Sequence, residues 1–138
     1  MAMNGIIIAL VEMVLIYKLE GRRKNMVYIT VGVAMIGVSF LLLNIPAAAL
    51  AVGFSMIILV TFGEILSMPF MNSYWIGRTQ PANRGEYAAL YTMAWSAAQT
   101  LGPMGGAQLA ERGGFMLLWW VVGAACLLAA LFYWKLHR

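Results

Sequence analysis

A glutamate inside an apolar segment is the residue of this sequence with the clearest potential for chemistry. Glu64 lies in the apolar stretch 47–71, and Pro69 follows five residues later. A carboxyl group in such a segment must be neutralised, paired or hydrated, and one that switches between its neutral and charged forms can carry a proton. Glu64 is therefore a candidate proton carrier or a counter-charge for a cationic substrate. A structural hydrogen bond to a neighbouring helix is the alternative.

Polar side chains recur at helical spacing in the segment 84–110. They are Thr92, Ser96 and Gln99, at positions i, i+4 and i+7; Pro103 continues the stripe at i+11, and Tyr91 and Trp95 lie beside it. This spacing places them on one face of a helix, and Pro103 also removes the amide that would bond the Gln99 carbonyl. The stripe predicts the lining of a substrate cavity. The alternative is that serine and threonine bond their own helix and the stripe packs against another helix.

Prolines and glycines predict two places where helices could bend. Pro69 leaves the carbonyl of Ile65, beside Glu64, without its helical partner. The second place is the end of the segment 84–110, with Gly102, Pro103, Gly105 and Gly106. We expect a hinge or a gate at these positions, because glycine and proline allow a helix to bend. Close packing of small residues is the alternative for the glycines.

The remaining residue types give little support for catalysis. Glu12 is a further candidate for the proton or substrate site, but its apolar segment 3–17 is shorter than the roughly 20 residues that span a bilayer. The one cysteine, Cys126, lies in an apolar segment, and the one histidine, His137, lies in the tail. We find no nucleophile–base pair, metal-binding cluster or phosphate-binding loop. The sequence therefore predicts no enzymatic activity, no metal and no cofactor.

The chain as a whole is more apolar and less charged than a soluble domain. The chain has 138 residues, of which 63% are hydrophobic and 10% charged, whereas soluble domains carry roughly 25% charged residues. Its mean hydropathy is +0.83. The net charge of +4 could suggest nucleic acid, but the basic residues lie in short runs between apolar segments and at the C-terminus. The partner expected from this pattern is the lipid bilayer, and not nucleic acid.

We therefore expect an all-α, polytopic membrane protein in one domain, residues 1–138, with five transmembrane helices. The segments are approximately 3–17, 26–43, 47–71, 84–110 and 115–134, with a turn at 111–114. The second and fifth segments have no charged residue, so we expect them to be lipid-facing scaffold and the other three to line a cavity. Gly32 and Gly37 of the second segment are five residues apart, which is a weak signal for helix packing.

Basic residues predict the orientation of the chain in the membrane. Eight fall on one side, and only Arg112 falls on the other. The eight are Lys18, Arg22, Arg23, Lys24, Arg78, Arg84, Lys135 and Arg138. Because basic residues concentrate in cytoplasmic segments, we expect a multi-pass protein of the cell (inner or plasma) membrane with a cytoplasmic C-terminus.

Over essentially its whole length the chain resembles the C-terminal part of a major facilitator superfamily transporter. Gly63-Glu64 with Pro69 resembles the tenth helix of drug/proton antiporters and of proton-coupled peptide carriers. Other segments resemble the eighth helix and its basic turn and the two ends of the eleventh helix. These are Asn4-Gly5, Glu20-Gly21-Arg22-Arg23-Lys24, Pro81-Ala82-Asn83-Arg84-Gly85 and Gly102-Pro103-Met104-Gly105-Gly106. The basic turn is a shortened version of the family's Asp-Arg-x-Gly-Arg-Arg pattern, with Glu20 in the acidic place.

This resemblance implies that the five segments correspond to the family's eighth to twelfth helices, of which the ninth and twelfth are peripheral. It also implies secondary active transport of a small organic molecule by alternating access, coupled to protons. The chain would then be a fragment, and the missing N-terminal half of the transporter would be its partner. Two other functions stay open: a small self-assembling membrane carrier, and a non-transporting membrane assembly subunit.

Overall fold

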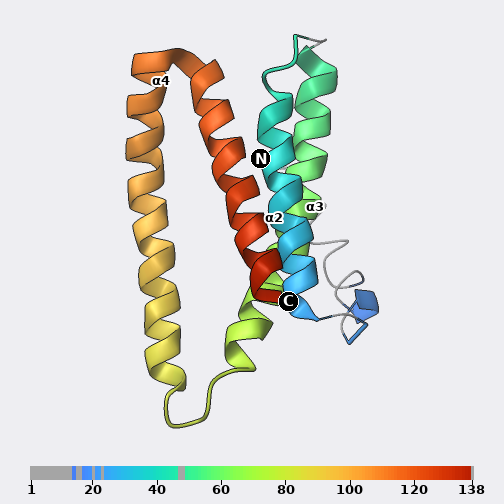
Figure 1. Ribbon diagram of the computed structural model, residues 1–138, viewed down its shortest axis with the longest axis vertical. Coiled ribbons are helices and arrows are strands. Elements are labelled where there is room, and N and C mark those ends of the chain that lie inside the picture. The colour runs from blue at the N-terminus through green and yellow to red at the C-terminus, as the bar shows by residue number, and fades with distance from the viewer. Residues whose placement is uncertain (1–13, 15–16, 20, 23, 47–48, 138) are drawn as a thin grey trace.

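Helices make up nearly all of the described part of the chain. The computed structural model describes residues 14, 17–19, 21–22, 24–46 and 49–137, and no strand occurs among them. The helices are α2 (Asn25–Leu42), α3 (Ala49–Ile76) and α4 (Arg84–His137), shown in Figure 1. Most of the predicted segment 3–17, including Glu12, lies outside the described residues, as do Glu20, Arg23 and Arg138. The all-α class is confirmed.

Each of these three helices is long and apolar enough to cross a membrane. The predicted count of five separate helices is not supported, because the segments 84–110 and 115–134 are joined in α4. Residues 111–113 keep a helical backbone, and Gly114 alone departs from it, with φ 73° and ψ 173°. Essentially only glycine adopts that conformation. Gly114 alone therefore bends the chain, whereas the sequence predicted a turn formed by the four residues 111–114.

The bend at Gly114 divides α4 into two arms. We call residues 84–113 the first arm and residues 115–137 the second arm. Figure 1 shows that the two arms run in opposite directions, the first in yellow and orange and the second in red. At 1.5 Å per residue the arms are about 45 and about 35 Å long, and the hydrocarbon core of a bilayer is about 30 Å thick. Each arm is long enough to cross a membrane.

Helix α2 lies between α3 and the second arm (Figure 1). The Tyr28 ring stacks on Phe70 of α3, with ring centroids 4.5 Å apart. Near the other end of α2, Phe40 stacks on Trp119 of the second arm at 5.7 Å. The expectation that this charge-free helix is peripheral is therefore wrong within the described chain. Apolar and aromatic packing, which needs no ionisable residue, makes α2 the central helix.

The spacing of Gly32 and Gly37 explains how α2 contacts two neighbours. Five residues correspond to about 140° of rotation around a helix, so the two glycines face different directions. A Cβ added to Gly32 would lie 2.6 Å from the Gly63 carbonyl oxygen of α3. One added to Gly37 would lie 3.0 Å from the Cys126 Cβ and 3.2 Å from the Gly123 carbonyl oxygen of the second arm. Each glycine thus allows one close helix–helix approach.

Helix α3 is longer than the predicted segment 47–71. It continues through Pro69 as far as Ile76, and the Gly77 amide donates to the Ser73 carbonyl at 3.0 Å where the helix ends. Proline removes one amide but leaves later helical bonds intact, so α3 can continue beyond it. The predicted end of this helix at residue 71 is therefore wrong, and the loop to α4 spans only 77–83.

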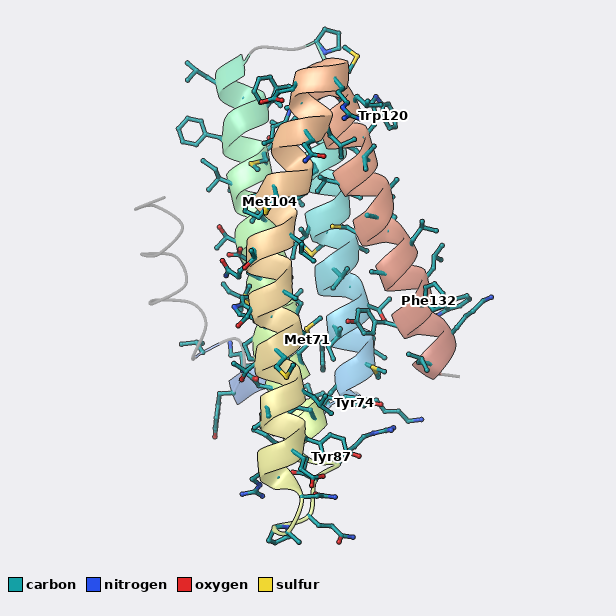
Figure 2. All side chains as sticks on the ribbon, turned by 90° about the vertical axis from the view of Figure 1, so that its left-hand side faces the viewer. Met71, Tyr74, Tyr87, Met104, Trp120 and Phe132 are labelled. Carbon is teal, nitrogen blue, oxygen red and sulfur yellow. The ribbon has the colours of Figure 1, made fainter. Side chains whose placement is uncertain are left out.

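The exposed surface of this bundle is largely apolar. Met104, Trp120 and Phe132 are all more than half exposed and are labelled in Figure 2. The buried hydroxyls of Ser39 and Thr61 donate to the carbonyls of Ile36 and Ile57 in their own helices. Polar groups bonded within their own helix, together with apolar side chains on the outside, suit a lipid environment.

Candidate functional site

Two adjacent hollows bring most of the predicted stripe together. The first, of about 270 Å3, is lined by Met68 and Asn72 of α3 and by Tyr91, Thr92 and Trp95 of the first arm. The second, of about 290 Å3, is lined by Trp95, Ala98, Gln99 and Pro103. Trp95 contributes to both hollows, so they adjoin along one face of the first arm. Ser96 lines neither of them.

Trp75 joins α3 to the first arm beside these hollows. Its ring stacks on Tyr91, with centroids 5.8 Å apart, and its Nε1 donates to Asn72 Oδ1 at 3.1 Å. Asn72 and Trp75 were not predicted as site residues, because the helix was expected to end at residue 71. A signal was present, since Met68, Asn72 and Trp75 lie at i, i+4 and i+7 and so share one helix face.

The threonines of the first arm bond their own helix. Thr92 Oγ1 donates to the Ala88 carbonyl at 2.9 Å, and Thr100 Oγ1 donates to the Ser96 carbonyl at 3.0 Å. These are the bonds that the packing alternative predicted. The Thr92 oxygen can still accept a hydrogen bond from a molecule in the hollow. Gln99 offers both donors and an acceptor, and it makes no hydrogen bond to another side chain in the described part of the chain.

Glu64 lies earlier in α3 than Met68 and Asn72, and it lines neither hollow. It is half-buried and follows Gly63, the residue that packs against Gly32 of α2. Met68 and Asn72 lie one and two turns after it on neighbouring parts of the same helix surface, and Asn72 is about 12 Å away along the axis. The structure therefore places Glu64 on the α3 side that leads to the hollows, but it does not unite Glu64 and Gln99 in one cavity.

The predicted bends are helical in the structure. Helix α3 continues through Pro69, and α4 continues through Pro103. A Cβ added to Gly102 or Gly105 would meet open space, whereas one added to Gly106 would lie 3.6 Å from Leu118 of the second arm. The reversal of the chain is at Gly114 instead. A hinge or gate at the Gly102–Gly106 positions stays a prediction.

The first arm is only thinly covered by the described chain. Every side chain from position 92 to position 105 is exposed, including the stripe residues Ser96 and Gln99. Trp95 is 45% exposed although it lines both hollows. The second arm differs, because it packs on α2 through Gly123 and Trp119. The polar stripe thus lies on the one arm that the described helices leave open.

The segments predicted to share one side of the membrane lie at one end of the molecule. In Figure 1 the start of α2 and the end of α4 lie in the lower half of the view, and the loop between α3 and α4 lies below them. Arg22 and Lys24 precede α2, and Arg84 begins α4. Arg112 lies next to the bend at the other end. Apart from Arg112, the basic residues named here therefore lie toward one end of the described bundle.

Comparison with models of protein families, with curated protein sequences and with solved structures finds no match to this chain. Within the described residues no three histidine, cysteine, aspartate or glutamate side chains come together as metal ligands. The candidate site is therefore defined by its own geometry: a polar and aromatic helix face, with a carboxyl group nearby on α3.

Proposed function

We propose that this chain is part of a secondary active transporter and that it forms one side of the pathway for a small organic molecule. Transport would be coupled to protons and would proceed by alternating access. Helices α2 and α3 and both arms of α4 would cross the cell membrane, with the C-terminus in the cytoplasm. The relationship to the major facilitator superfamily that the sequence indicates belongs to this proposal.

One observation carries the proposal: the polar stripe and the hollows occupy an arm that the described chain leaves exposed. Trp95 and Tyr91 supply aromatic surface, and Asn72 and Gln99 supply amide groups. Small-molecule sites combine an apolar, aromatic lining with a few polar groups in this way. A helix that turns an amide toward lipid loses its hydrogen bonds, so this face requires water or protein opposite it.

Glu64 would be the proton-coupling group. It lies at mid-length of α3, half-buried, on the side that leads to the hollows. A carboxyl group that is neutral in a dry state and charged in a hydrated one links proton binding to a change in access. Met68, which lies between Glu64 and Asn72, is flexible enough to adapt to different bound molecules.

A second helical unit would complete the pathway. Alternating access requires two bodies that move against each other around a central site. The described helices cover the second arm and leave the first arm open, so the first arm would face that second body. In transporters of the major facilitator superfamily, the N-terminal half faces the C-terminal half across the pathway. We propose that a corresponding N-terminal half is the partner that faces the first arm here.

The proposal can be tested by proton flux in membrane vesicles that contain the chain with its natural partners. An inward proton gradient is followed with a pH-sensitive dye while small organic molecules are added in turn. The molecule transported should collapse the gradient in the wild type. Glu64→Gln should abolish this response because the amide cannot ionise, and Glu64→Asp should retain part of it. A response of wild-type size in Glu64→Gln would make Glu64 a structural residue.

A further inference from the structure

A third hollow lies at the basic end of the molecule, away from the candidate transport site. Its volume is about 380 Å3, larger than either hollow along the first arm. Three segments far apart in the sequence form it: the start of α2, the end of α3 and the end of α4. The lining residues are Lys24, Asn25, Met26, Tyr74, Arg78 and Leu136.

Two cations from different parts of the chain line this hollow: Lys24 directly before α2, and Arg78 in the loop that follows α3. The Arg78 guanidinium carbon lies 4.6 Å from the centroid of the Tyr74 ring, a cation–π contact that holds it at the edge of the hollow. Of the five acidic residues in the sequence, Glu64, Glu86 and Glu111 are described, and none of them lines the hollow. The described lining therefore has a net positive charge.

The start of α2 adds to this positive potential. Its first turn contains no acidic residue, and Lys24 at the N-cap makes no side-chain hydrogen bond to the helix. The unbonded amides and the helix dipole at such a start favour an anion. Asn25 and Tyr74 bring an amide and a hydroxyl to the same hollow. Two cations, two polar side chains and a helix start thus converge on one space.

The rest of the lining is apolar and points to a lipid. Leu136, at the end of the second arm, lines the hollow and is 69% exposed, and Met26, which also lines it, is buried. A free phosphate ion would leave Leu136 uncovered. A phospholipid would place its phosphate between Lys24 and Arg78 and its glycerol and acyl carbons against Leu136. Both ligands share the phosphate group, but only the lipid matches the whole surface.

We propose that this hollow binds the phosphate group of an anionic phospholipid, with Arg78 and Lys24 as its charged partners. Arginine can bind two phosphate oxygens with its planar guanidinium, and lysine adds a point charge. The site lies at the end where helices α2 and α4 leave the apolar region, which is where lipid headgroups lie. The inference does not depend on the transport proposal, because it uses none of the residues of the first arm.

Native mass spectrometry of the full chain in a neutral detergent tests this site. The chain is incubated with equal amounts of phosphatidylglycerol and phosphatidylcholine, and the lipid retained per chain is counted. Each cation near a membrane surface is worth about 1 kcal/mol, which is about fivefold in affinity. With two cations we expect phosphatidylglycerol to be preferred about 25-fold, and we expect inorganic phosphate at equal concentration not to displace it.

Variants identify the position of the site. Arg78→Gln and, separately, Lys24→Gln should each lower the preference about fivefold, while Arg78→Lys should keep most of it. The matched control is Arg112→Gln, which removes the same charge at the opposite end and should leave the preference unchanged. Circular dichroism checks that each variant keeps its helix content. If Arg78→Gln does not fold, Lys24→Gln alone tests the site.

Three results would overturn the inference. Equal retention of both lipids by the wild type would mean that the hollow does not select an anionic headgroup. An equal loss in Arg112→Gln would mean that general surface charge, and not this hollow, attracts the lipid. Displacement by inorganic phosphate at equal concentration would mean that the hollow recognises the phosphate group alone and that the glycerol and acyl carbons of the lipid add nothing to binding.

Discussion

Gly32 of α2 and Gly63 of α3 meet backbone to backbone. A Cβ added to Gly32 would lie 2.6 Å from the Gly63 carbonyl oxygen, and a Cβ added to Gly63 would lie 2.8 Å from the Gly32 carbonyl oxygen. Close contact between small residues is the principal way in which membrane helices associate. Because Gly63 precedes Glu64, this contact also sets the height of the carboxyl group along α2.

Gly63→Ala should therefore loosen the α2–α3 pair. The added methyl group meets the Gly32 carbonyl oxygen and the Ile36 side chain, and relief requires the two helices to separate. Overpacking of this kind lowers the free energy of unfolding by about 1–3 kcal/mol. Thermal unfolding of the full chain in detergent micelles measures the change.

Gly53→Ala is the matched control for this substitution. Gly53 lies in the same helix, and a Cβ there would meet no atom within 4 Å. It should leave the unfolding temperature unchanged or raise it slightly, because alanine favours a helix over glycine. Equal unfolding temperatures for Gly63→Ala and Gly53→Ala would show that the close contact is not needed for stability.

The bend at Gly114 makes a second prediction. Gly114→Ala should lower the stability of the α4 hairpin by about 1–3 kcal/mol, because a Cβ is strained at φ 73° and ψ 173°. Gly105→Ala is the control, since Gly105 is helical and faces open space. Cross-linking between cysteines at positions 106 and 118, with Cys126→Ala, reports whether the arms stay together. Undiminished cross-linking and stability in Gly114→Ala would refute the special role of this glycine.

The positions of most helices could be predicted from the local sequence pattern, but the full length of α3 and the packing between helices depend on side-chain contacts. The apolar run of α2 was placed within one residue at each end, because its boundaries coincide with charged and polar residues. The extension of α3 to Ile76 was missed because polar residues such as Asn72 were read as a connector. They remain helical, with Trp75 bonded to Asn72 and stacked on Tyr91.

The candidate site was also predicted only in part: the stripe residues were grouped, but their neighbours were not predicted. Helical spacing alone grouped Thr92, Gln99 and Pro103, and the hollows contain all three. Spacing could not show which helix faces them, because the contact of α3 with the first arm depends on how the loop 77–83 brings the two helices together. For the same reason the central position of α2 was missed: its role comes from glycine and aromatic contacts, which carry no charge signal.

The arrangement of basic residues predicts the topology. We expect the C-terminus in the cytoplasm and the bend at Gly114 outside, because the basic residues gather at the end with the start of α2 and the end of α4. A reporter enzyme active only in the cytoplasm, fused after Arg138, should be active. An insertion of the same reporter next to Gly114 should be inactive. The reverse pattern would contradict the proposed orientation.

The exposed first arm predicts that the chain needs a partner for transport. Purified chain in lipid vesicles should move none of the molecules that collapse the proton gradient in native membranes, because nothing in the described chain closes the face that carries Gln99. Vesicles without protein give the background. Transport above this background would instead favour the small self-assembling carrier, in which a second copy covers the arm.

The central prediction is that the stripe of the first arm faces a water-filled pathway. Ser96 and Gln99 lie on the stripe, and Leu90 and Leu101 lie on the opposite face of the same arm. All four side chains are exposed in the structure, so what differs between them in the membrane is whether water or lipid surrounds them. The face in contact with water can be identified chemically.

The measurement is the labelling of single cysteines with a water-soluble maleimide in native membranes. Cysteines replace Ser96, Gln99, Leu90 and Leu101 one at a time in a chain carrying Cys126→Ala. A maleimide reacts only with thiols that water reaches, since the reactive thiolate does not form in lipid. We predict fast labelling at positions 96 and 99 and protection at positions 90 and 101. Equal labelling at all four positions, or labelling only at 90 and 101, would contradict the account.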